Sequence, residues 1–390
     1  MPSHSIIEGS LRYNLLIMKT VGIYPYNDWP KIFKIYANFF YLIFTIPTPI
    51  LILVNFILME EKTLERICDS AFLGAQLGTL LVKLWPFKSN PEAIKRTVKA
   101  LNQEIFNSYR QDQECIVKSA IKEYNFIFLG VISASGVSFV TWFGKIFFYE
   151  EKRFPLEIWL PFDAFEDTRI YVGVLVYLFF CVLIGALDNA SLDTLIVGMI
   201  FQSATQVKIL KNDLQFLHER IEQKVNDNFD SKGVKENRIY KSICKSIDHY
   251  DAIFQYAKDI ERVYSTVIFS QLFVSIVVIC ISCLQLSIVE PFTILFFGMV
   301  IYIMTMLMQV FLYCYYGTML YEESNTLTTA IYESEWYNYD HRSKKCLLTL
   351  MERAKRPIKQ TAGKFFDLSL ETFTMILRRS YSLLAVLQNY

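Results

Sequence analysis

The 390-residue sequence lacks the residue patterns that mark most enzymes and nucleic-acid-binding proteins. It contains no phosphate-binding glycine loop, no zinc-ligand spacing and no nucleophile elbow, and its four histidines are not spaced as metal ligands. No basic tail or patch is concentrated in one region, and the net charge is only +1. The sequence therefore predicts no catalytic site, no metal or other cofactor, and no nucleic-acid partner.

We expect neither a cleavable signal peptide nor an extracellular disulfide. The first 30 residues contain no apolar run of signal-peptide length that ends in small residues, so we expect the first membrane span to act as its own signal. The eight cysteines lie in apolar runs or in segments assigned below to the cytosol. We expect them to be free thiols and small buried side chains.

Apolar residues, by contrast, are abundant. The sequence is 53% hydrophobic and 16% aromatic, which is too apolar for an ordinary soluble domain. A helix needs about 20 apolar residues to cross a bilayer. Seven runs are long enough, of which the second and seventh are the most interrupted by charge: Ile32–Met59, Ile67–Phe87, Tyr124–Phe148, Ile170–Phe201, Val263–Val289, Phe292–Gly317 and Lys364–Tyr390. These runs predict an all-α membrane protein with seven transmembrane helices.

The distribution of Lys and Arg predicts the orientation of these helices. Both residue types are concentrated in the N-terminal segment and in the segments 88–123, 202–262 and 318–363. The alternate segments contain only Lys62, Arg66, Lys145, Lys152, Arg153 and Arg169. Because positively charged loops stay in the cytosol, we expect a cytosolic N-terminus and an extracellular C-terminus. This orientation disfavours a G-protein-coupled receptor.

The same patterns divide the chain into segments. Apolar residues recur at three-to-four spacing over 207–225 and 239–260, on either side of a turn at 226–234. They predict two amphipathic helices that extend the neighbouring spans and form part of a cytosolic anchor bundle. The predicted segments are the cytosolic 1–31, spans one to four in 32–201 with an external loop at 144–169, the cytosolic hairpin 202–262, spans five and six in 263–317, the anchor helices 318–363, and the last helix 364–390.

Two regions within this scheme carry functional hypotheses. The external loop contains Phe154, Trp159 and two prolines, so we expect a folded lid that either shapes entry to a site or caps the bundle. Asp188 and Asp193, in the fourth run, point about 140° apart on a helix. We therefore expect hydrogen-bonded polar groups there, not a catalytic pair of carboxylates.

The last run carries polar residues along one side of an otherwise apolar helix. At about 100° per residue, these positions form one stripe. The stripe consists of Asp367, Glu371, Thr374, Arg378, Ser382, Ala385 and Asn389. Such a helix either lines water inside a membrane or is buried in a bundle with its charges paired.

The run AGKFFDLSLETFTMILRRSYSLLAVLQ at Ala362–Gln388 resembles the C-terminal signature of insect odorant receptors. The seven runs, the long cytosolic helices and the external pair Pro161 and Phe162 agree with that family. The chain lacks the long insertion expected in the family's shared co-receptor, so it resembles an odour-tuned subunit.

The resemblance implies a ligand-gated, nonselective cation channel in the plasma membrane of a sensory neuron dendrite. Four subunits, including the co-receptor, would surround a central pore lined by the last helix. Asp367 and Glu371 would then lie at the cytosolic mouth, and Ser382 to Asn389 near the external one. Aligning the family pattern on Tyr381 places the gate at Leu384, whereas aligning it on Gln388 places the gate at Ala385. The polar stripe favours Ala385.

The resemblance also implies that a small volatile organic ligand binds in the outer half of spans two, three, four and six. An apolar, aromatic cavity with a few hydroxyl groups suits such a molecule. The candidate residues are Phe72, Ala75, Gln76, Ser135, Ser138, Trp142, Tyr171, Tyr177, Phe296, Phe297 and Tyr302. Ser135, Ser138 and Trp142 share one helical face.

Three other classes remain to be weighed. A gustatory receptor of the same superfamily shares the topology and the pore, but the run SLETFTMILRRSYS favours the odorant branch. A G-protein-coupled receptor requires the opposite orientation. A secondary transporter typically shows a repeat between its halves, which is not found here.

The orientation can be tested with an epitope tag at each end of the chain. We expect immunofluorescence to detect a C-terminal tag in intact cells and an N-terminal tag only after permeabilisation, because the charged loops remain in the cytosol. A C-terminal tag that is hidden in intact cells would contradict the predicted topology.

Overall fold

The computed structural model describes residues 10–24, 31–58, 64–148, 152–228, 232–289 and 291–388. These residues are almost entirely helical, as predicted. The α-helices are α2 (Arg12–Thr20), α3 (Lys31–Phe40), α4 (Pro47–Leu58), α5 (Leu64–Ser89), α6 (Pro91–Ala100), α7 (Glu104–Asn107), α8 (Glu114–Gly144), α9 (Thr168–Gln215), α10 (Leu217–Asn228), α11 (Lys232–Ile288), α12 (Ile294–Asn325), α13 (Leu327–Glu333), α14 (His341–Ala354) and α15 (Leu370–Gln388). The described residues also form a π-helix, η1 (Tyr41–Thr45), short 3₁₀-helices, η2 (Gln111–Gln113), η3 (Lys145–Phe148) and η4 (Trp336–Asn338), and two short strands, β1 (Thr361–Ala362) and β2 (Phe366–Asp367).

Several helices are long and apolar enough to cross a membrane. Within the described residues these are Ile35–Leu58, Gln111–Gly144, Thr168–Gln215, Gly233–Ser287 and Phe296–Glu333. The other two runs, which the sequence marks as the most interrupted, form α5 and α15 and fall outside this group. Their charged side chains lower the hydropathy without preventing the helices from forming.

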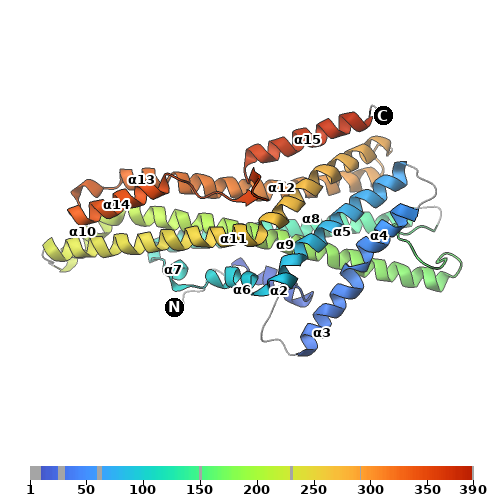
Figure 1. Ribbon diagram of the computed structural model, residues 1–390, viewed down its shortest axis with the longest axis horizontal. Helices are drawn as coiled ribbons and strands as arrows, with labels where there is room; N and C mark the ends of the chain where they lie inside the picture. The colour runs from blue at the N-terminus through green and yellow to red at the C-terminus, as the bar shows by residue number, and fades with distance from the viewer. Residues whose placement is uncertain are drawn as a thin grey trace.

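Two helices are much longer than a bilayer is thick. α9 has 48 residues and α11 has 57. At 1.5 Å per residue they extend about 72 Å and 86 Å, against about 30 Å for the hydrocarbon core. Both helices run along the long axis of the molecule (Figure 1). Each therefore continues a membrane span into the end of the molecule where α10, α13 and α14 lie.

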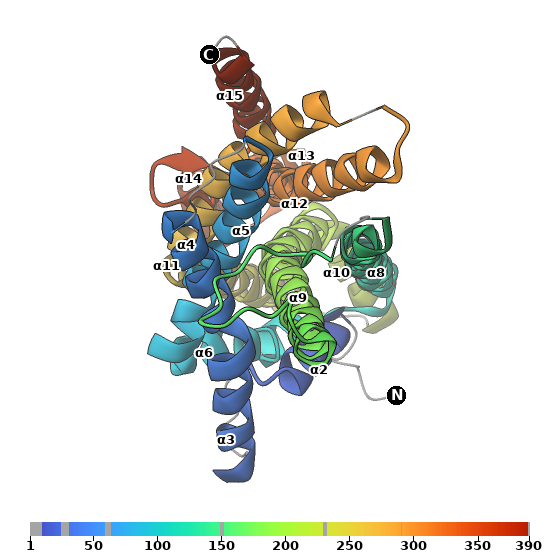
Figure 2. The same cartoon turned by 90° about the vertical axis from the view of Figure 1, so that its right-hand side faces the viewer.

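α9 is the central helix of the bundle. Every residue from Asp188 to Val207 is buried, which is the pattern of a helix covered on all sides. It packs against α5, α8, α11 and α12, and it lies near the middle of the end-on view (Figure 2). At Gly198 an added Cβ would come within 2.4 Å of the Tyr124 ring, so only glycine allows α8 to approach this closely.

A buried polar network joins the N-terminal helix α2 to α8 and α9. Asn14 Nδ2 donates to the Tyr124 hydroxyl over 2.6 Å, and that hydroxyl donates to the Thr194 carbonyl over 3.1 Å. Thr194 Oγ1 in turn lies 3.0 Å from Asn14 Oδ1. These bonds hold α2 against the bundle, although the sequence predicts only an undivided N-terminal segment.

A buried ion pair joins α5, α9 and α12. Lys83 Nζ lies 2.6 Å from Asp193 Oδ1, and the two side chains are 0% and 4% exposed. Lys83 Nζ also donates to Asn189 Oδ1 over 2.5 Å, and the Tyr313 hydroxyl donates to Asp193 Oδ1 over 2.8 Å. Asp193 Oδ1 is therefore hydrogen-bonded, as the sequence predicts, whereas Asp193 Oδ2 has no hydrogen-bond partner among the described residues.

The far end of the molecule is a second helical bundle. α13 packs on α9, and α14 packs on both α11 and α13. Lys211 Nζ and Glu323 Oε2 are 2.6 Å apart, and Arg353 pairs with Asp251 over the same distance. Burial of His249 lowers the pKa of its imidazole to about 4, so it is neutral where its Nε2 meets Gln206 Oε1 at 2.9 Å.

The external segment after α8 is folded against the bundle over residues 152–167. Leu156, Ile158 and Ala164 are buried, and the Trp159 N–H donates to the Leu51 carbonyl over 3.2 Å. Leu156 and Ile158 form one apolar cluster with Ile52 and Leu178. The segment thus covers the outer ends of α4 and α9 and is not a loose tether.

The last helix begins later than the sequence predicts. Thr361 pairs with Asp367 in a two-stranded hairpin, and the chain reverses at Gly363 and Lys364, whose φ angles are +61° and +63°. α15 begins only at Leu370, where Ser369 Oγ accepts a hydrogen bond from the Thr372 N–H over 3.2 Å. The prediction of one helix over 364–390 is therefore wrong at its start, because the hairpin precedes it.

The buried ion pair predicts a large stability effect. In Lys83→Ala, Asp193 loses its counter-charge, which should lower the free energy of unfolding by about 3–5 kcal/mol. Lys83→Met combined with Asp193→Leu should recover most of this loss, since apolar replacement of a buried pair is often neutral. Thermal unfolding of the detergent-solubilised protein measures both.

A matched control for this experiment is Lys118→Ala. The Lys118 side chain is 71% exposed and pairs with Glu114 on the helix surface. Its loss should cost less than about 1 kcal/mol. If Lys83→Ala is no more damaging than Lys118→Ala, the buried pair does not hold the bundle together.

Candidate functional site

One cavity of about 110 Å³ lies between α5, α8, α9 and α12. Its lining is mostly apolar with several amides and hydroxyls: Gln76, Leu77, Leu80, Ser135, Ser138, Phe139, Trp142, Val182, Gly185, Ala186, Asn189, Tyr302, Thr305, Met306 and Gln309. An engineered apolar cavity of about 150 Å³ binds benzene, so this space suits a molecule of about one ring. An apolar chamber with a few polar groups is the usual form of a small-molecule site.

Five of the predicted ligand-binding residues line this cavity. They are Gln76, Ser135, Ser138, Trp142 and Tyr302. The three-to-four spacing on α8 places its members on the cavity side, as the helical periodicity predicts. Tyr302 approaches from α12 and Gln76 from α5, so residues more than 200 positions apart meet at one chamber.

The other predicted residues lie elsewhere. Tyr171 stacks on Phe154 of the external segment, with ring centroids 5.1 Å apart, and Tyr177 donates to the Ile43 carbonyl over 2.7 Å. Tyr177 faces away because it lies about 140° around α9 from Val182. Ala75 packs with Val278 and Ile279. Phe296 and Phe297 contact each other near the start of α12. The Phe72 side chain lies outside the described residues.

Sequence reasoning missed the inner part of the chamber. It considered only the outer halves of the spans, whereas Asn189 and Gln309 lie deeper. The sequence does contain an indication of this space, namely the two small residues Gly185 and Ala186 of α9. Small side chains leave space beside a helix, and an added Cβ at Gly185 would lie only 3.2 Å from Leu77.

The chamber adjoins the buried ion pair. Asn189 belongs to both, since it lines the cavity and accepts a hydrogen bond from Lys83 Nζ. Ser138 Oγ and Thr305 Oγ1 lie 2.9 Å apart and link α8 to α12 across the lining. The polar groups that shape the cavity are therefore held by helix-to-helix hydrogen bonds.

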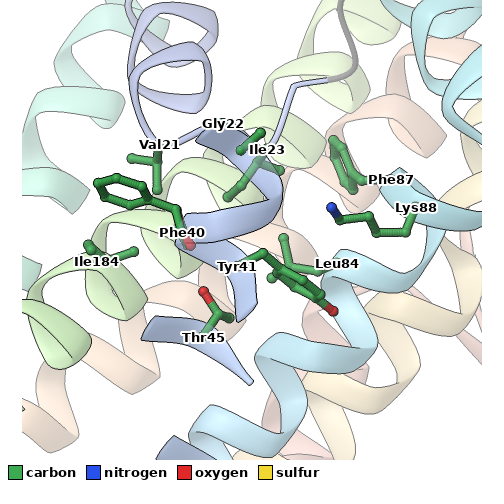
Figure 3. Close-up of a pocket in the computed structure, with 12 residues that line it drawn as sticks. Val21, Gly22, Ile23, Phe40, Tyr41, Thr45, Leu84, Phe87, Lys88 and Ile184 are labelled. Carbon is green, nitrogen blue, oxygen red and sulfur yellow. The ribbon is translucent and has the colours of Figure 1, made fainter. Parts of the chain in front are cut away.

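A second, smaller cavity of about 20 Å³ lies between the segment after α2, η1, α5 and α9. Val21, Phe40, Tyr41 and Ile184 are among the side chains that surround it (Figure 3). Asp188 also lines it, and Asp188 Oδ1 has no hydrogen-bond partner among the described residues. The expectation that Asp188 is fully hydrogen-bonded is therefore wrong for this oxygen. The space is large enough for a water molecule.

α15 lies at the margin of the bundle in both views (Figures 1 and 2). It packs against α11 and α12 through Thr372, Ile376 and Ser380, which are all buried. The opposite face is exposed, because positions two residues apart on a helix differ by about 200°. This exposed face contains Glu371, Thr374, Arg378 and Ser382 of the predicted polar stripe.

The other predicted pore residues are Asp367, Leu384, Ala385, Gln388 and Asn389. Asp367 lies in β2, where its carboxylate accepts a hydrogen bond from Lys359 Nζ over 2.7 Å, so it does not belong to the helical stripe. This correction follows from the hairpin that precedes α15. Leu384 and Ala385 are both half-buried. The Gln388 side chain and all of Asn389 lie outside the described residues.

Possible metal ligands are not clustered in the part of the chain that the structure describes. No three His, Cys, Asp or Glu side chains come together there as a possible ion site.

Comparisons with known proteins agree with this arrangement. Residues 63–381 match the family model described as 7tm Odorant receptor. Odorant receptor Or1 of Anopheles gambiae is 22% identical over 344 residues, covering 85% of this chain and 82% of that protein. Odorant receptor 94a of Drosophila melanogaster is 23% identical over 411 residues, covering 100% and 99%.

A solved structure shares the fold. The insect olfactory receptor OR5 from Machilis hrabei, in complex with eugenol, is similar with a TM-score of 0.83 over 97% of both chains, at 16% sequence identity. The same receptor in a second structure, whose title names no ligand, gives a TM-score of 0.81 at 17% identity. At these identities the likeness concerns the fold alone.

The largest aromatic side chain of the cavity offers a direct test. If a small apolar ligand occupies the chamber, Trp142→Ala removes part of its contact surface and should weaken the response about tenfold, or about 1.4 kcal/mol. A dose-response curve over a broad panel of volatile molecules measures this.

Trp85→Ala is the matched control, because Trp85 is 70% exposed on α5 and does not line the cavity. It should leave the dose response unchanged. Unchanged responses in Trp142→Ala would rule out this residue as part of the site.

Proposed function

The chain belongs to the insect odorant receptor family, as its C-terminal run predicts, and we propose that it is an odour-tuned subunit of a ligand-gated, nonselective cation channel. A small volatile molecule binds in the chamber between α5, α8, α9 and α12. Binding opens a pore lined by α15 from this subunit and its neighbours. The observation that carries the proposal is that α12 belongs to both the chamber and the contact with α15.

The chamber supports the ligand-binding half of this proposal. Its lining combines aromatic and aliphatic side chains, which supply affinity by burying apolar ligand surface at about 25 cal/mol per Å². The few polar groups orient the ligand. Gln76, Ser135, Ser138, Trp142 and Tyr302 are the predicted binding residues that remain in the proposal.

The exposed face of α15 supports the pore-lining half. Glu371, Thr374, Arg378 and Ser382 lie on the side of α15 that faces away from its own bundle. A polar stripe of this kind is expensive when it faces lipid but suits hydrated cations. The helix thus gains a suitable environment when other subunits close a ring around it.

The contacts of α12 connect the chamber to α15. The first half of α12 contributes Tyr302, Met306 and Gln309 to the chamber. Its inner part meets the start of α15. The contacts there are the Leu370 N–H bonded to Thr318 Oγ1 over 3.0 Å, the rings of Phe311 and Phe373 at 5.6 Å, and Gly317 packed so closely on Leu368 that an added Cβ would lie 2.4 Å from its carbonyl oxygen.

A gating mechanism follows from these contacts. A ligand can shift the closed–open equilibrium only by the difference in its affinity for the two states. Ligand contact with α12 favours one position of that helix, and the tight contact at Gly317 transmits the position to the base of α15. Displacement of the base moves the gate near Leu384 or Ala385.

The proposed setting is the plasma membrane of a sensory neuron dendrite, in a heterotetramer with the family's co-receptor. Large apolar side chains on the outside of the bundle fit contact with lipid: Trp85, Phe126, Leu129 and Val140 are 63–77% exposed. They lie on helices predicted to span the membrane.

Recording currents from transfected cells tests the channel and its gate together. We expect volatile ligands to evoke cation current when the chain is expressed with a co-receptor. In Ala385→Cys, an external thiol reagent should block this current, because the side chain faces the pore. Leu384→Cys should be affected less, since Leu384 lies about 100° around the helix.

Two results would count against the proposal. Absence of current with every ligand, despite surface expression, contradicts the channel function. An Ala385→Cys current that stays unblocked while Leu384→Cys is blocked moves the gate to Leu384.

A further inference from the structure

Two glutamine side chains give the chamber an unusual hydrogen-bonding character. Gln76 lies on α5 and Gln309 on α12, and both line the cavity. Their Oε1 atoms are buried, and neither has a hydrogen-bond partner within the residues that the structure describes. Buried polar atoms in native proteins are nearly always hydrogen-bonded, so two unpartnered acceptors at one cavity indicate a donor supplied by what binds there.

The hydroxyl pair of Ser138 and Thr305 is also limited to accepting. Thr305 Oγ1 donates its only hydrogen to the Ile301 carbonyl over 2.9 Å. Ser138 Oγ lies 2.9 Å from Thr305 Oγ1, so Ser138 must be the donor of that bond. The remaining capacity of Ser138 is therefore its lone pairs, which accept a hydrogen bond from a ligand.

Asn189 supplies a hydrogen-bond donor to the chamber. Its Oδ1 accepts a hydrogen bond from Lys83 Nζ over 2.5 Å, which determines the orientation of the amide. The Nδ2 hydrogens remain for other partners. The chamber thus offers these three acceptors together with amide donors from Asn189 and the two glutamines, and a hydroxyl group is the small group that both donates and accepts.

We propose that the chamber selects compact molecules that carry a hydroxyl group, namely alcohols or phenols with about one ring, over carbonyl compounds and hydrocarbons of the same size. This inference rests on the proposed function of the chamber as the ligand site. Gln76 and Gln309 are the specificity-determining residues: they accept the hydroxyl hydrogen, which an aldehyde, an ether or a hydrocarbon does not have.

The polar lining should lower the affinity for ligands that lack a hydroxyl group. A site built to hydrogen-bond a hydroxyl rejects analogues that lack it strongly, because its own buried polar groups then stay unpaired. A purely apolar chamber distinguishes such analogues far less. The polar lining therefore predicts discrimination by functional group, with the cavity volume limiting size.

The test uses three probes that share one ring: benzyl alcohol, benzaldehyde and toluene. Binding to the purified, detergent-solubilised receptor is measured by titration, independently of any current. We expect a dissociation constant for benzyl alcohol at least tenfold lower than for benzaldehyde or toluene. Gln309→Met and Gln76→Met, which keep the side-chain volume but remove the acceptor, should each reduce this preference severalfold.

Gln202→Met is the matched control, since Gln202 is a buried glutamine of α9 that does not line the chamber. It should leave the preference for the alcohol unchanged. Retained binding of toluene by Gln309→Met would show that the variant is folded and that only the hydroxyl preference is lost.

Measuring ligand binding and current separately distinguishes the proposed hydroxyl selectivity from the proposed channel function. Equal affinities for the three probes, no binding by any of them, or an unchanged preference in both glutamine variants would overturn the hydroxyl selectivity, whatever the current. A clear alcohol preference without current from any ligand would support the selectivity and contradict the channel function.

Discussion

The buried ion pair between Lys83 and Asp193 is the constraint on which the bundle depends. Removing two charges from water costs several kcal/mol for each ion, and only good geometry with further hydrogen bonds offsets this cost. Here Lys83 Nζ reaches Asp193 and Asn189, while Tyr313 donates to the same Asp193 oxygen. The partners come from α5, α9 and α12. A rotation or a one-turn slip of α5 against α9 would leave a charge unpaired, and the same movement of α12 would remove the Tyr313 hydrogen bond, so the network sets their register.

The position of the chamber follows from that register. α5, α9 and α12 supply Gln76, Gly185 and Gln309 to the lining, and Asn189 belongs to both the network and the cavity. About two turns beyond Gln309 on α12, Gly317 packs on Leu368 at the base of α15. The Tyr313 hydrogen bond to Asp193 therefore ties α12 to the network at a position between the chamber and α15. Movement of α12 relative to α5 and α9 requires a change in these hydrogen bonds, which gives the receptor a definite resting arrangement.

Much of this fold could be predicted from hydropathy and helical periodicity. The apolar runs, the extensions of α9 and α11, and the cavity face of α8 all follow from spacing alone. Partners distant in sequence could not be found in that way. In the sequence, Lys83 only interrupts a weakly apolar span. Its partner Asp193 lies 110 positions later, and only the fold shows that the two side chains form an ion pair. The start of α15 was misplaced for a related reason: residues 364–369 are apolar enough for a helix, and only pairing of Thr361 with Asp367 makes them a hairpin.

The gate residue could not be decided from one chain for a further physical reason. Ile376 is 3% exposed and fixes the face of α15 that packs on its own bundle, but Tyr381 is 73% exposed near the other end of the helix. Leu384 and Ala385 are both half-buried, so the fold of one subunit does not distinguish them. A helix whose polar face is exposed inside a membrane requires neighbours that enclose that face. In the proposed assembly, contacts between subunits would set the rotation of α15 about its axis and with it the position of the proposed gate. The polar stripe can thus be predicted from the sequence, whereas the proposed gate depends on neighbouring subunits.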